Sequence, residues 1–197
     1  MLDTWFNRAG SATDKFLNDT SQALVDVGVS AELLTYAGVA FGTLAGALFY
    51  YGYDPQAFAC ILFSGFLDAI DGRVARLGEG PTLWGGVLDL TFDRVVEASV
   101  LLGITIPRPE LHIPGLVLAA TWYVNLCVFL AVGAASEKRG EKMIEYPPGL
   151  LERGESLVFA FAVVAVPSIA GAAAYVYAVL EVITAAQRFS HGRRELS

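Results

Sequence analysis

The sequence predicts an all-α membrane protein with six transmembrane helices and an N-terminal amphipathic helix that lies in the membrane interface. Three observations lead to this prediction. The 197 residues are 55% hydrophobic, with a mean hydropathy of +0.53 and only 17% charged residues, which is more apolar than an ordinary soluble domain. Apolar runs long enough to cross a bilayer recur along the chain. Lysines and arginines gather where the loops of one membrane side would lie.

Residues 1–28 form the first predicted unit, an N-terminal juxtamembrane segment. Its apolar residues recur at helical spacing among polar ones, which fits a helix in the cytoplasmic interface with Trp5 at the level of the lipid headgroups. The segment has no apolar core of the kind that a cleavable signal peptide needs. We expect it to anchor the first span; the alternative is a lid over a binding site.

Residues 29–192 form the predicted six-helix domain, because a spanning helix needs roughly 20 mostly apolar residues. The last apolar run, 157–186, is too long for one span, and Pro167, Ser168 and Gly171 interrupt it with helix-breaking chemistry. We therefore divide it into a fifth helix that begins near Leu150 and a sixth that ends near Arg188. The four earlier spans are 33–51, 55–77, 83–106 and 114–135.

The distribution of positive charge favours six helices over five. With both termini in the cytoplasm, all of the 13 lysines and arginines except Arg108 fall on the cytoplasmic side, as expected of cytoplasmic loops and helix ends. Five helices would move the basic tail "RFSHGRR", residues 188–194, to the other side, whereas six leave it, and the tail 193–197 that follows the last helix, in the cytoplasm. We therefore expect an integral protein of the cell inner membrane with both termini in the cytoplasm.

The partners are constrained by charge and by a stripe of glycines. The net charge of −7 excludes a broad basic surface, so we expect no nucleic acid partner. Gly38, Gly42 and Gly46 form a doubled G-x-x-x-G stripe in the first span, along which another helix backbone can approach closely. That helix belongs either to the same chain or to a second copy in a homodimer.

Four aspartates interrupt the second and third spans. Asp68 and Asp71 are three residues apart, and Asp89 and Asp93 are four apart, so each pair lies on one face of its helix. The two spans run antiparallel through a cytoplasmic connection near Gly80, and the two pairs are about equally far from it. We therefore expect all four carboxylates to converge at one depth, a little inside the cytoplasmic face.

Clustered carboxylates in a low-dielectric setting must be protonated or neutralised by cations. Oxygen-only ligands suit Mg²⁺ or Mn²⁺, and two ions would neutralise four charges and keep positions open for a phosphate substrate. Gly72, Ala75 and Gly85 lack bulk, so a ligand can approach the backbone beside the aspartates. Two alternatives stay open: a buried ionic network with the arginines of the same spans, and the ion or proton pathway of a transporter.

Written out, residues 68–93 read D-x-x-D-G-x-x-A-R-x8-G-x-x-x-D-x-x-x-D. This pattern resembles the signature of the CDP-alcohol phosphatidyltransferase family, and the six-span layout is similar to that family's membrane fold. The resemblance implies that an acceptor alcohol attacks a CDP-linked lipid, such as CDP-diacylglycerol or an ether analogue, at its lipid-side phosphorus and releases CMP. It also implies a homodimer, and an active site open to the cytoplasm and to one leaflet.

The resemblance further implies a role for each residue of the pattern. Asp68, Asp71 and Asp89 would ligate two divalent metals, Mg²⁺ or Mn²⁺. Asp93 would complete that metal site and, as general base, accept the proton of the acceptor hydroxyl. The segment "AELLT" keeps the threonine of a Pro-Asn-x-x-Thr pattern that touches the nucleotide in family members. The residues implied to line the nucleotide and pyrophosphate pocket are Thr35, Gly72, Ala75, Arg76 and Gly85.

Further matches concern the acceptor, a small alcohol or phosphorylated alcohol such as glycerol 3-phosphate or inositol phosphate. The stretch "GLLERGE", residues 149–155, is similar to one found in some prokaryotic members, including members that use inositol phosphate. Its Arg153 would clamp a phosphate of the acceptor or of CDP; the alternative is a positive anchor on the cytoplasmic side, paired with Glu155. The stretch "TAAQR" near the end of the last span also looks family-like and offers Arg188 as a second phosphate ligand. Lys138 and Arg139 are expected near the same face.

Overall fold

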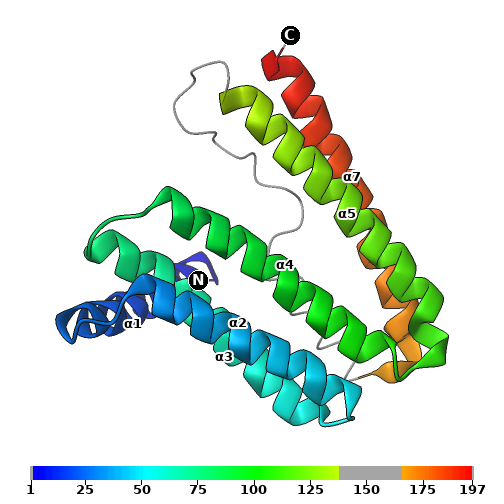
Figure 1. Ribbon diagram of the computed structural model, residues 1–197, viewed down its shortest axis with the longest axis horizontal. Helices are drawn as coiled ribbons and strands as arrows, with labels where there is room; N and C mark the ends of the chain where they lie inside the picture. The colour runs from blue at the N-terminus through cyan, green and yellow to red at the C-terminus, as the bar shows by residue number, and fades with distance from the viewer. Residues whose placement is uncertain (1, 138–165, 197) are drawn as a thin grey trace. The chain divides into compact units, whose positions relative to one another are not determined.

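The computed structural model describes the backbone of residues 2–137 and 166–196, with side chains for 13–135, 166 and 168–196. Across these residues the protein is all-α, as predicted (Figure 1). The predicted fifth span lies outside the described residues, and so do Lys138, Arg139 and Arg153. The described helices are α1 (Leu2–Asp26), α2 (Ala31–Tyr50), α3 (Asp54–Leu77), α4 (Leu83–Thr105), α5 (His112–Glu137) and α7 (Ala170–Leu196), with 3-10 turns η1 (Pro109–Leu111) and η2 (Pro167–Ile169).

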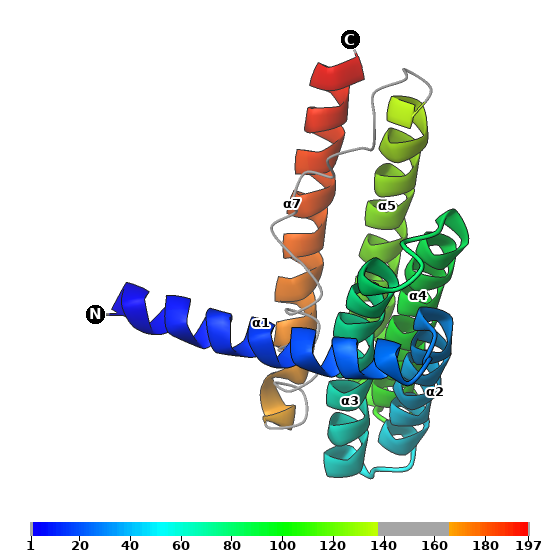
Figure 2. The ribbon, with the colours of Figure 1, turned by 90° about the vertical axis from the view of Figure 1, so that its left-hand side faces the viewer.

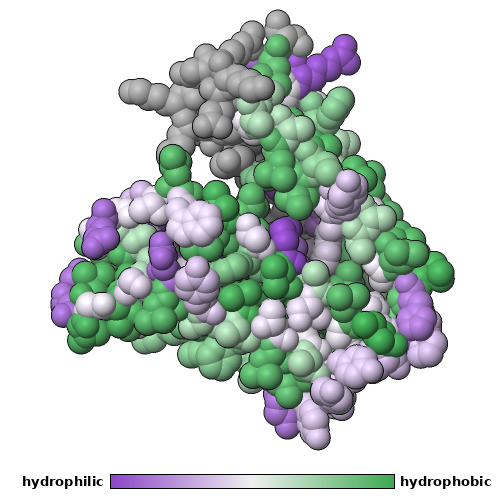
Figure 3. Space-filling model, in the orientation of Figure 1, coloured by the Kyte–Doolittle hydropathy of each residue, from purple (hydrophilic) through white to green (hydrophobic). Residues whose placement is uncertain are grey.

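Several of these helices have the length and composition of membrane spans. Within the described residues, Ala31–Tyr50, Pro109–Ala135 and Ala170–Leu196 are long and apolar enough to cross a bilayer. Helices α3 and α4 are each about 35 Å long at a rise of 1.5 Å per residue, but their charged residues make them less apolar overall. Large hydrophobic side chains stay exposed along α2, α5 and α7, and hydrophobic residues cover much of the face in Figure 3.

The chain divides into two compact units, Met1–Gly103 and Ile104–Ser197. In the first unit, local sequence determines where the helices begin and turn. Ser30 caps α2 by accepting a hydrogen bond from the Leu33 amide (3.3 Å), and Thr82 caps α4 in the same way for the Gly85 amide (2.9 Å). Between α3 and α4, Gly80 has a φ of +94°, which glycine adopts without a steric cost. The predicted turn is therefore confirmed.

The other end of the α2–α3 hairpin carries a cluster of tyrosines. Tyr50, Tyr51 and Tyr53 are all exposed, and they flank the short connection between the two helices. Tyrosine is enriched at the depth of the lipid headgroups, because its ring is apolar and its hydroxyl is polar. These residues indicate the membrane boundary farthest from the Gly80 turn.

Helix α1 crosses α3 and is fastened to it by both apolar and polar contacts (Figure 2). Leu17 of α1 packs against the core cluster that contains Ile70. The Arg73 guanidinium donates to the Asp14 carboxylate (2.8 Å) and to the Asn18 side-chain oxygen (2.7 Å). The structure confirms an N-terminal helix, and its depth in the membrane interface stays a prediction.

The glycine stripe of α2 is occupied by helices of the same chain. A Cβ atom at Gly42 would collide with the Val96 side chain, and one at Gly46 would collide with the backbone of Ser99, both on α4. Gly38 faces α3 instead. The sequence allowed either a helix of the same chain or a helix of a second copy to pack on this stripe. In the structure, helices of the same chain do so.

In the second unit, α5 and α7 lie side by side and run in the same direction (Figure 1). Helices α5 and α7 correspond to the predicted fourth and sixth spans. When six spans alternate in direction, these two run the same way. The predicted break at Pro167 is confirmed, since η2 occupies Pro167–Ile169 and α7 begins at Ala170. Helix α7 continues to Leu196, past the end expected near Arg188, because its last turns still pack on α5 through Gly192 and Val132.

Candidate active site

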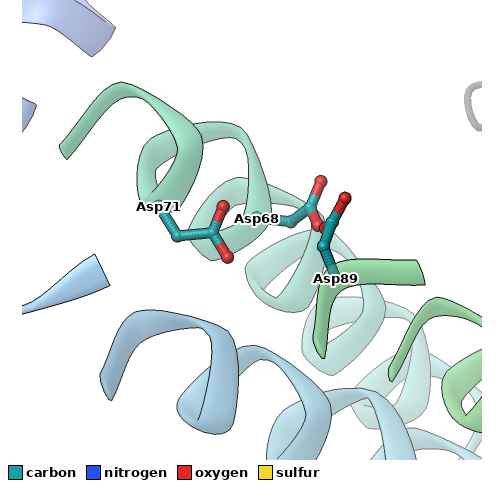
Figure 4. A group of neighbouring side chains, drawn as sticks. All are labelled: Asp68, Asp71 and Asp89. Atoms are coloured by element: carbon teal, nitrogen blue, oxygen red, sulfur yellow. The ribbon is translucent and has the colours of Figure 1, made fainter. Parts of the chain in front are cut away.

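Three of the four aspartates meet where α3 and α4 lie together. Each of Asp68, Asp71 and Asp89 offers a carboxylate oxygen, and these oxygens lie within 4.8 Å of one another, as Figure 4 shows. Asp71 is buried, Asp68 is half-buried and Asp89 is exposed. We call this group the acidic trio. It is buried at Asp71 and exposed at Asp89.

Asp93 is not a member of the acidic trio. The sequence predicted that all four carboxylates converge; the structure brings three of them together, and the part of Asp93 stays a prediction. Asp93 lies about 6 Å further along α4 than Asp89, one turn later in the helix. Asp93 is half-buried one turn beyond the trio.

Thr35 of α2 positions the buried member of the trio. Its hydroxyl donates to Oδ2 of Asp71 (2.7 Å) and also lies 3.0 Å from the carbonyl oxygen of Ala31, one turn earlier in α2. A hydrogen bond to a carboxylate is stronger than one between neutral groups, so it restricts the orientation of Asp71. The sequence singled out Thr35 only as a nucleotide contact, and its contact with Asp71 was not foreseen.

The small residues beside the trio have distinct surroundings. A Cβ atom at Gly72 would lie 3.5 Å from Nη1 of Arg76, so the exposed Arg76 guanidinium lies back over the glycine that follows Asp71. A Cβ atom at Gly85 would lie 3.1 Å from Oγ1 of Thr82, so this glycine leaves room for the cap of α4. Gly72 and Arg76 thus offer a small surface and a cation next to Asp71.

Two arginines of α3 and α4 make ion pairs with carboxylates outside the trio. Arg73 bonds to Asp14 of α1, and Arg94 bonds to Glu97 one turn along α4 (2.7 Å). Neither ion pair uses a carboxylate of the trio.

The trio fits a divalent cation. Its ligand atoms are all carboxylate oxygens, which hard cations such as Mg²⁺ and Mn²⁺ prefer. A buried carboxylate such as Asp71 is costly unless a counter-charge or hydrogen bonds compensate it. Hydrogen bonds from the Thr35 hydroxyl and the Gly72 amide supply part of this compensation, and a bound cation would supply more. Asp68, Asp71 and Asp89 are the residues that would hold the metal.

In the second unit, Arg188 belongs to a chain of polar contacts between α5 and α7. Its Nη1 donates to Oδ1 of Asn125 (2.9 Å), and its guanidinium lies 5.2 Å from the centre of the Phe129 ring. The Asn125 amide nitrogen donates to Oε2 of Glu181. Sequence reasoning missed Asn125 and Glu181, although a polar residue in an otherwise apolar span is itself a functional signal.

Comparison with known families decides the class of the protein. A family model described as CDP-alcohol phosphatidyltransferase matches residues 29–187. The chain belongs to the CDP-alcohol phosphatidyltransferase family. It is an integral membrane phosphatidyltransferase of phospholipid synthesis, which confirms the predicted family and reaction class and replaces the transporter alternative.

Curated relatives match this phosphatidyltransferase over most of its length. The archaetidylinositol phosphate synthase of Pyrococcus horikoshii is 28% identical over 184 residues, which are 91% of this chain and 92% of that protein. The phosphatidylinositol phosphate synthase of Mycolicibacterium smegmatis is 30% identical over 152 residues, 73% of this chain and 65% of that protein. The inner membrane protein YnjF of Escherichia coli is 30% identical over 154 residues, 72% of each chain.

Solved structures show the same fold. The Mycobacterium tuberculosis phosphatidylinositol phosphate synthase PgsA1 with CDP-DAG bound has a TM-score of 0.76 at 23% identity, covering 90% of this chain and 94% of that one. Its complex with manganese and citrate has a TM-score of 0.72 at 24% identity, covering 89% and 88%. The phosphatidyltransferase thus has the fold of this synthase.

Proposed function

We propose that this phosphatidyltransferase moves a phosphatidyl-type group from a CDP-linked lipid to a hydroxyl of an inositol phosphate and releases CMP. The observation that carries the proposal is the acidic trio, to which α3 contributes Asp68 and Asp71 and α4 contributes Asp89, within the residues that the family model matches. The similarity to archaeal and bacterial inositol phosphate synthases supports an inositol phosphate as acceptor. The CDP-DAG bound to PgsA1 supports a CDP-linked lipid as donor.

The proposed metal site uses Asp68, Asp71 and Asp89, with Asp93 completing it, and two ions of Mg²⁺ or Mn²⁺. The manganese complex of PgsA1 supports this choice of metal. When bound, such ions would neutralise phosphate charge and polarise the phosphoryl group. Thr35 holds Asp71 in its orientation by the hydrogen bond to Oδ2.

Asp93 is the proposed general base. One of its carboxylate oxygens accepts the proton of the acceptor hydroxyl, while the oxygen of that hydroxyl forms a bond to the lipid-side phosphorus. The bond between this phosphorus and the pyrophosphate bridging oxygen breaks, and CMP leaves with the electron pair. The half-buried position of Asp93, one turn beyond the trio, keeps the base on the same helix as Asp89.

The proposed donor pocket lies around Gly72, Ala75 and Arg76, with Thr35 and Gly85 as further nucleotide contacts. The exposed Arg76 guanidinium over Gly72 suits a pyrophosphate, which arginine binds through two parallel hydrogen bonds. The proposed acceptor ligands are Arg153, Lys138, Arg139 and Arg188.

The proposed membrane topology has six spans between an interfacial helix, residues 1–28, and a cytoplasmic tail, residues 193–197. Both termini and the active site face the cytoplasm, and the similarity to the inner membrane protein YnjF supports the inner membrane. A homodimer is also proposed. Since α4 fills the Gly42 and Gly46 part of the stripe, the dimer must use another surface.

The test is CMP release by the purified protein with CDP-diacylglycerol or its ether analogue, Mg²⁺ or Mn²⁺, and one acceptor at a time. We expect release with an inositol phosphate and much less with glycerol 3-phosphate, serine or free inositol. The lipid product is identified by mass spectrometry. Transfer to a neutral alcohol in preference to every phosphorylated one would overturn the proposed acceptor class.

A further inference from the structure

We propose that Asn125 and Glu181 are positioning residues, which together hold the Arg188 guanidinium in the orientation that binds the acceptor phosphate. The inference rests on the proposed function and adds to it, because neither residue belongs to the family motif in residues 68–93. It concerns only the contact between α5 and α7, within one compact unit.

The three polar side chains form an ordered chain of contacts. Asn125 and Glu181 expose only 8% and 6% of their surface. Glu181 and Arg188 are seven residues apart, so they lie about two turns apart on one face of α7. The Asn125 side chain, on α5, lies between them and bonds to both. A single amide thus connects a buried anion on α7 to a cation on the same helix.

The Glu181 carboxylate and the Arg188 guanidinium determine how the Asn125 amide between them is oriented. A carboxylate only accepts hydrogen bonds and a guanidinium only donates them. The amide must therefore turn its nitrogen to Glu181 and its oxygen to Arg188, and a flipped amide would lose both bonds. Phe129, one turn after Asn125 on α5, lies under the guanidinium (5.2 Å) and adds a cation–π contact.

These contacts reduce the freedom of Arg188 before any ligand binds. A long arginine side chain normally loses much rotamer entropy when it is immobilised. Here the amide on α5 and the Phe129 ring already restrict it. An arginine held in this way favours a phosphate, which it can bind through two parallel hydrogen bonds, over a neutral hydroxyl. The pair therefore contributes to the preference for phosphorylated acceptors.

A purely structural role is the competing explanation, since polar side chains also join helices within membranes. The two explanations differ in what a substitution changes. Loss of interhelical adhesion lowers stability and affects all kinetic constants together. Loss of positioning raises the KM for the phosphorylated acceptor selectively, while the KM for the CDP-linked lipid stays the same.

The experiment compares Asn125→Leu with the wild-type enzyme in the CMP-release assay. Because a hydrogen bond to a charged group is lost, we expect the acceptor KM to rise about 10- to 100-fold, with the KM for CDP-lipid within about twofold. Glu181→Leu should raise the acceptor KM in the same direction. The conservative Glu181→Gln keeps an oxygen for the Asn125 amide, so it should restore a KM near that of the wild type.

Tyr177→Leu is the matched control, because Tyr177 packs edge-on against Trp122 one turn away in the same α5–α7 contact (6.0 Å between ring centroids). It should lower the melting temperature without changing the acceptor KM. If Asn125→Leu does not fold, Glu181→Leu makes the same test while Asn125, the contact partner of Arg188, stays in place.

Two results overturn the inference while the proposed function stands. One is an unchanged acceptor KM in folded Asn125→Leu or Glu181→Leu. The other is a rise in acceptor KM that Tyr177→Leu reproduces in proportion to its loss of stability. If the wild-type enzyme releases no CMP with any phosphorylated acceptor, the proposed function fails first, and the inference fails with it.

Discussion

One hydrogen bond joins α2 to the acidic trio, from Oγ1 of Thr35 to Oδ2 of Asp71 (2.7 Å). Asp71 is the buried member of the trio, so its orientation depends on the few polar groups around it. Loss of a partner that orients a metal ligand typically lowers metal affinity about 10- to 100-fold. Thr35 is therefore expected to matter through Asp71 whether or not it also touches the nucleotide.

Thr35→Val removes this hydroxyl and nearly conserves the shape of the side chain. We expect the affinity for Mn²⁺ or Mg²⁺ to fall about 10- to 100-fold, measured as the metal concentration that gives half-maximal CMP release and as direct Mn²⁺ binding. Thr43→Val is the control, since the Thr43 hydroxyl donates to Val39 in its own helix (2.8 Å). A wild-type metal dependence in Thr35→Val would show that the hydrogen bond is dispensable.

Asp93→Asn tests the proposed general base. The amide keeps the size of the side chain but accepts no proton, so we expect kcat to fall about 10²- to 10⁴-fold. Binding of the CDP-linked lipid should stay close to that of the wild type, because asparagine keeps one oxygen for the metal site and the three aspartates of the trio are unchanged. Turnover at the wild-type rate would remove Asp93 as the base. A loss of CDP-lipid binding equal to the loss of rate would assign Asp93 to the metal site alone.

At the scale of the elements, the packing of α4 on α2 determines where Asp89 lies. The backbones of the two helices approach closely at Gly46, which meets both Ser99 and Gly103 of α4. The Ser99 hydroxyl also donates to the carbonyl oxygen of Thr43 (3.2 Å). A shift of α4 at this contact moves Asp89 relative to the two aspartates of α3. Catalytic geometry therefore depends on glycines far from the trio.

Gly46→Ala places a methyl group where α4 now lies. Because the obstacle is backbone rather than a flexible side chain, we expect a loss of about 1–3 kcal/mol in the free energy of unfolding, together with lower activity. Thermal unfolding in detergent and CMP release measure the two effects. Gly65→Ala on α3 is the control, since a Cβ atom there meets nothing within 4 Å. Equal effects of the two substitutions would contradict the assigned contact.

The elements and the acidic site were largely predictable because local rules determine them. The Gly80 turn, the break at Pro167 and the levels of Asp68, Asp71 and Asp89 all follow from helix periodicity and turn chemistry. What could not be predicted depends on how helices pack. Sequence spacing does not reveal that Thr35 reaches Asp71.

Two further features show the same limit. Asp93 shares a helix face with Asp89, but it lies one turn further along α4 and is not part of the trio, so its exact place in the site depends on packing that spacing does not give. Asn125 and Glu181 lie on helices separated by an entire predicted span, so their hydrogen bond is invisible to any pattern within one helix. Helix α7 likewise continues to Leu196, where its last turns pack on α5 through Gly192 and Val132. Residues 189–196 contain no proline that would end the helix earlier, but the sequence alone does not show this packing.

At the scale of the whole molecule, the proposed topology places the α3–α4 connection in the cytoplasm and the α4–α5 connection on the other side. Glu79 and Glu110 lie in these two connections, and both are exposed. In a variant whose Cys60 and Cys127 are replaced, we expect Glu79→Cys to react with a membrane-impermeant thiol reagent only from the cytoplasmic side. Glu110→Cys should react only from the opposite side.

Reaction of both positions from one side would contradict the six-span topology. Reaction of each from the side opposite to the expected one would reverse the orientation of the protein and place the acidic trio on the wrong face of the membrane. The native cysteines are removed because Cys127 is exposed and Cys60 is partly so.

The most direct test of the metal role of the acidic trio is the metal dependence of CMP release from CDP-diacylglycerol, compared between the wild-type enzyme and Asp68→Ala. We expect that chelation abolishes release by the wild-type enzyme, that Mg²⁺ or Mn²⁺ restores it, and that no metal concentration restores it in folded Asp68→Ala. Release that persists after chelation, or an Asp68→Ala enzyme with the metal response of the wild type, would contradict this role.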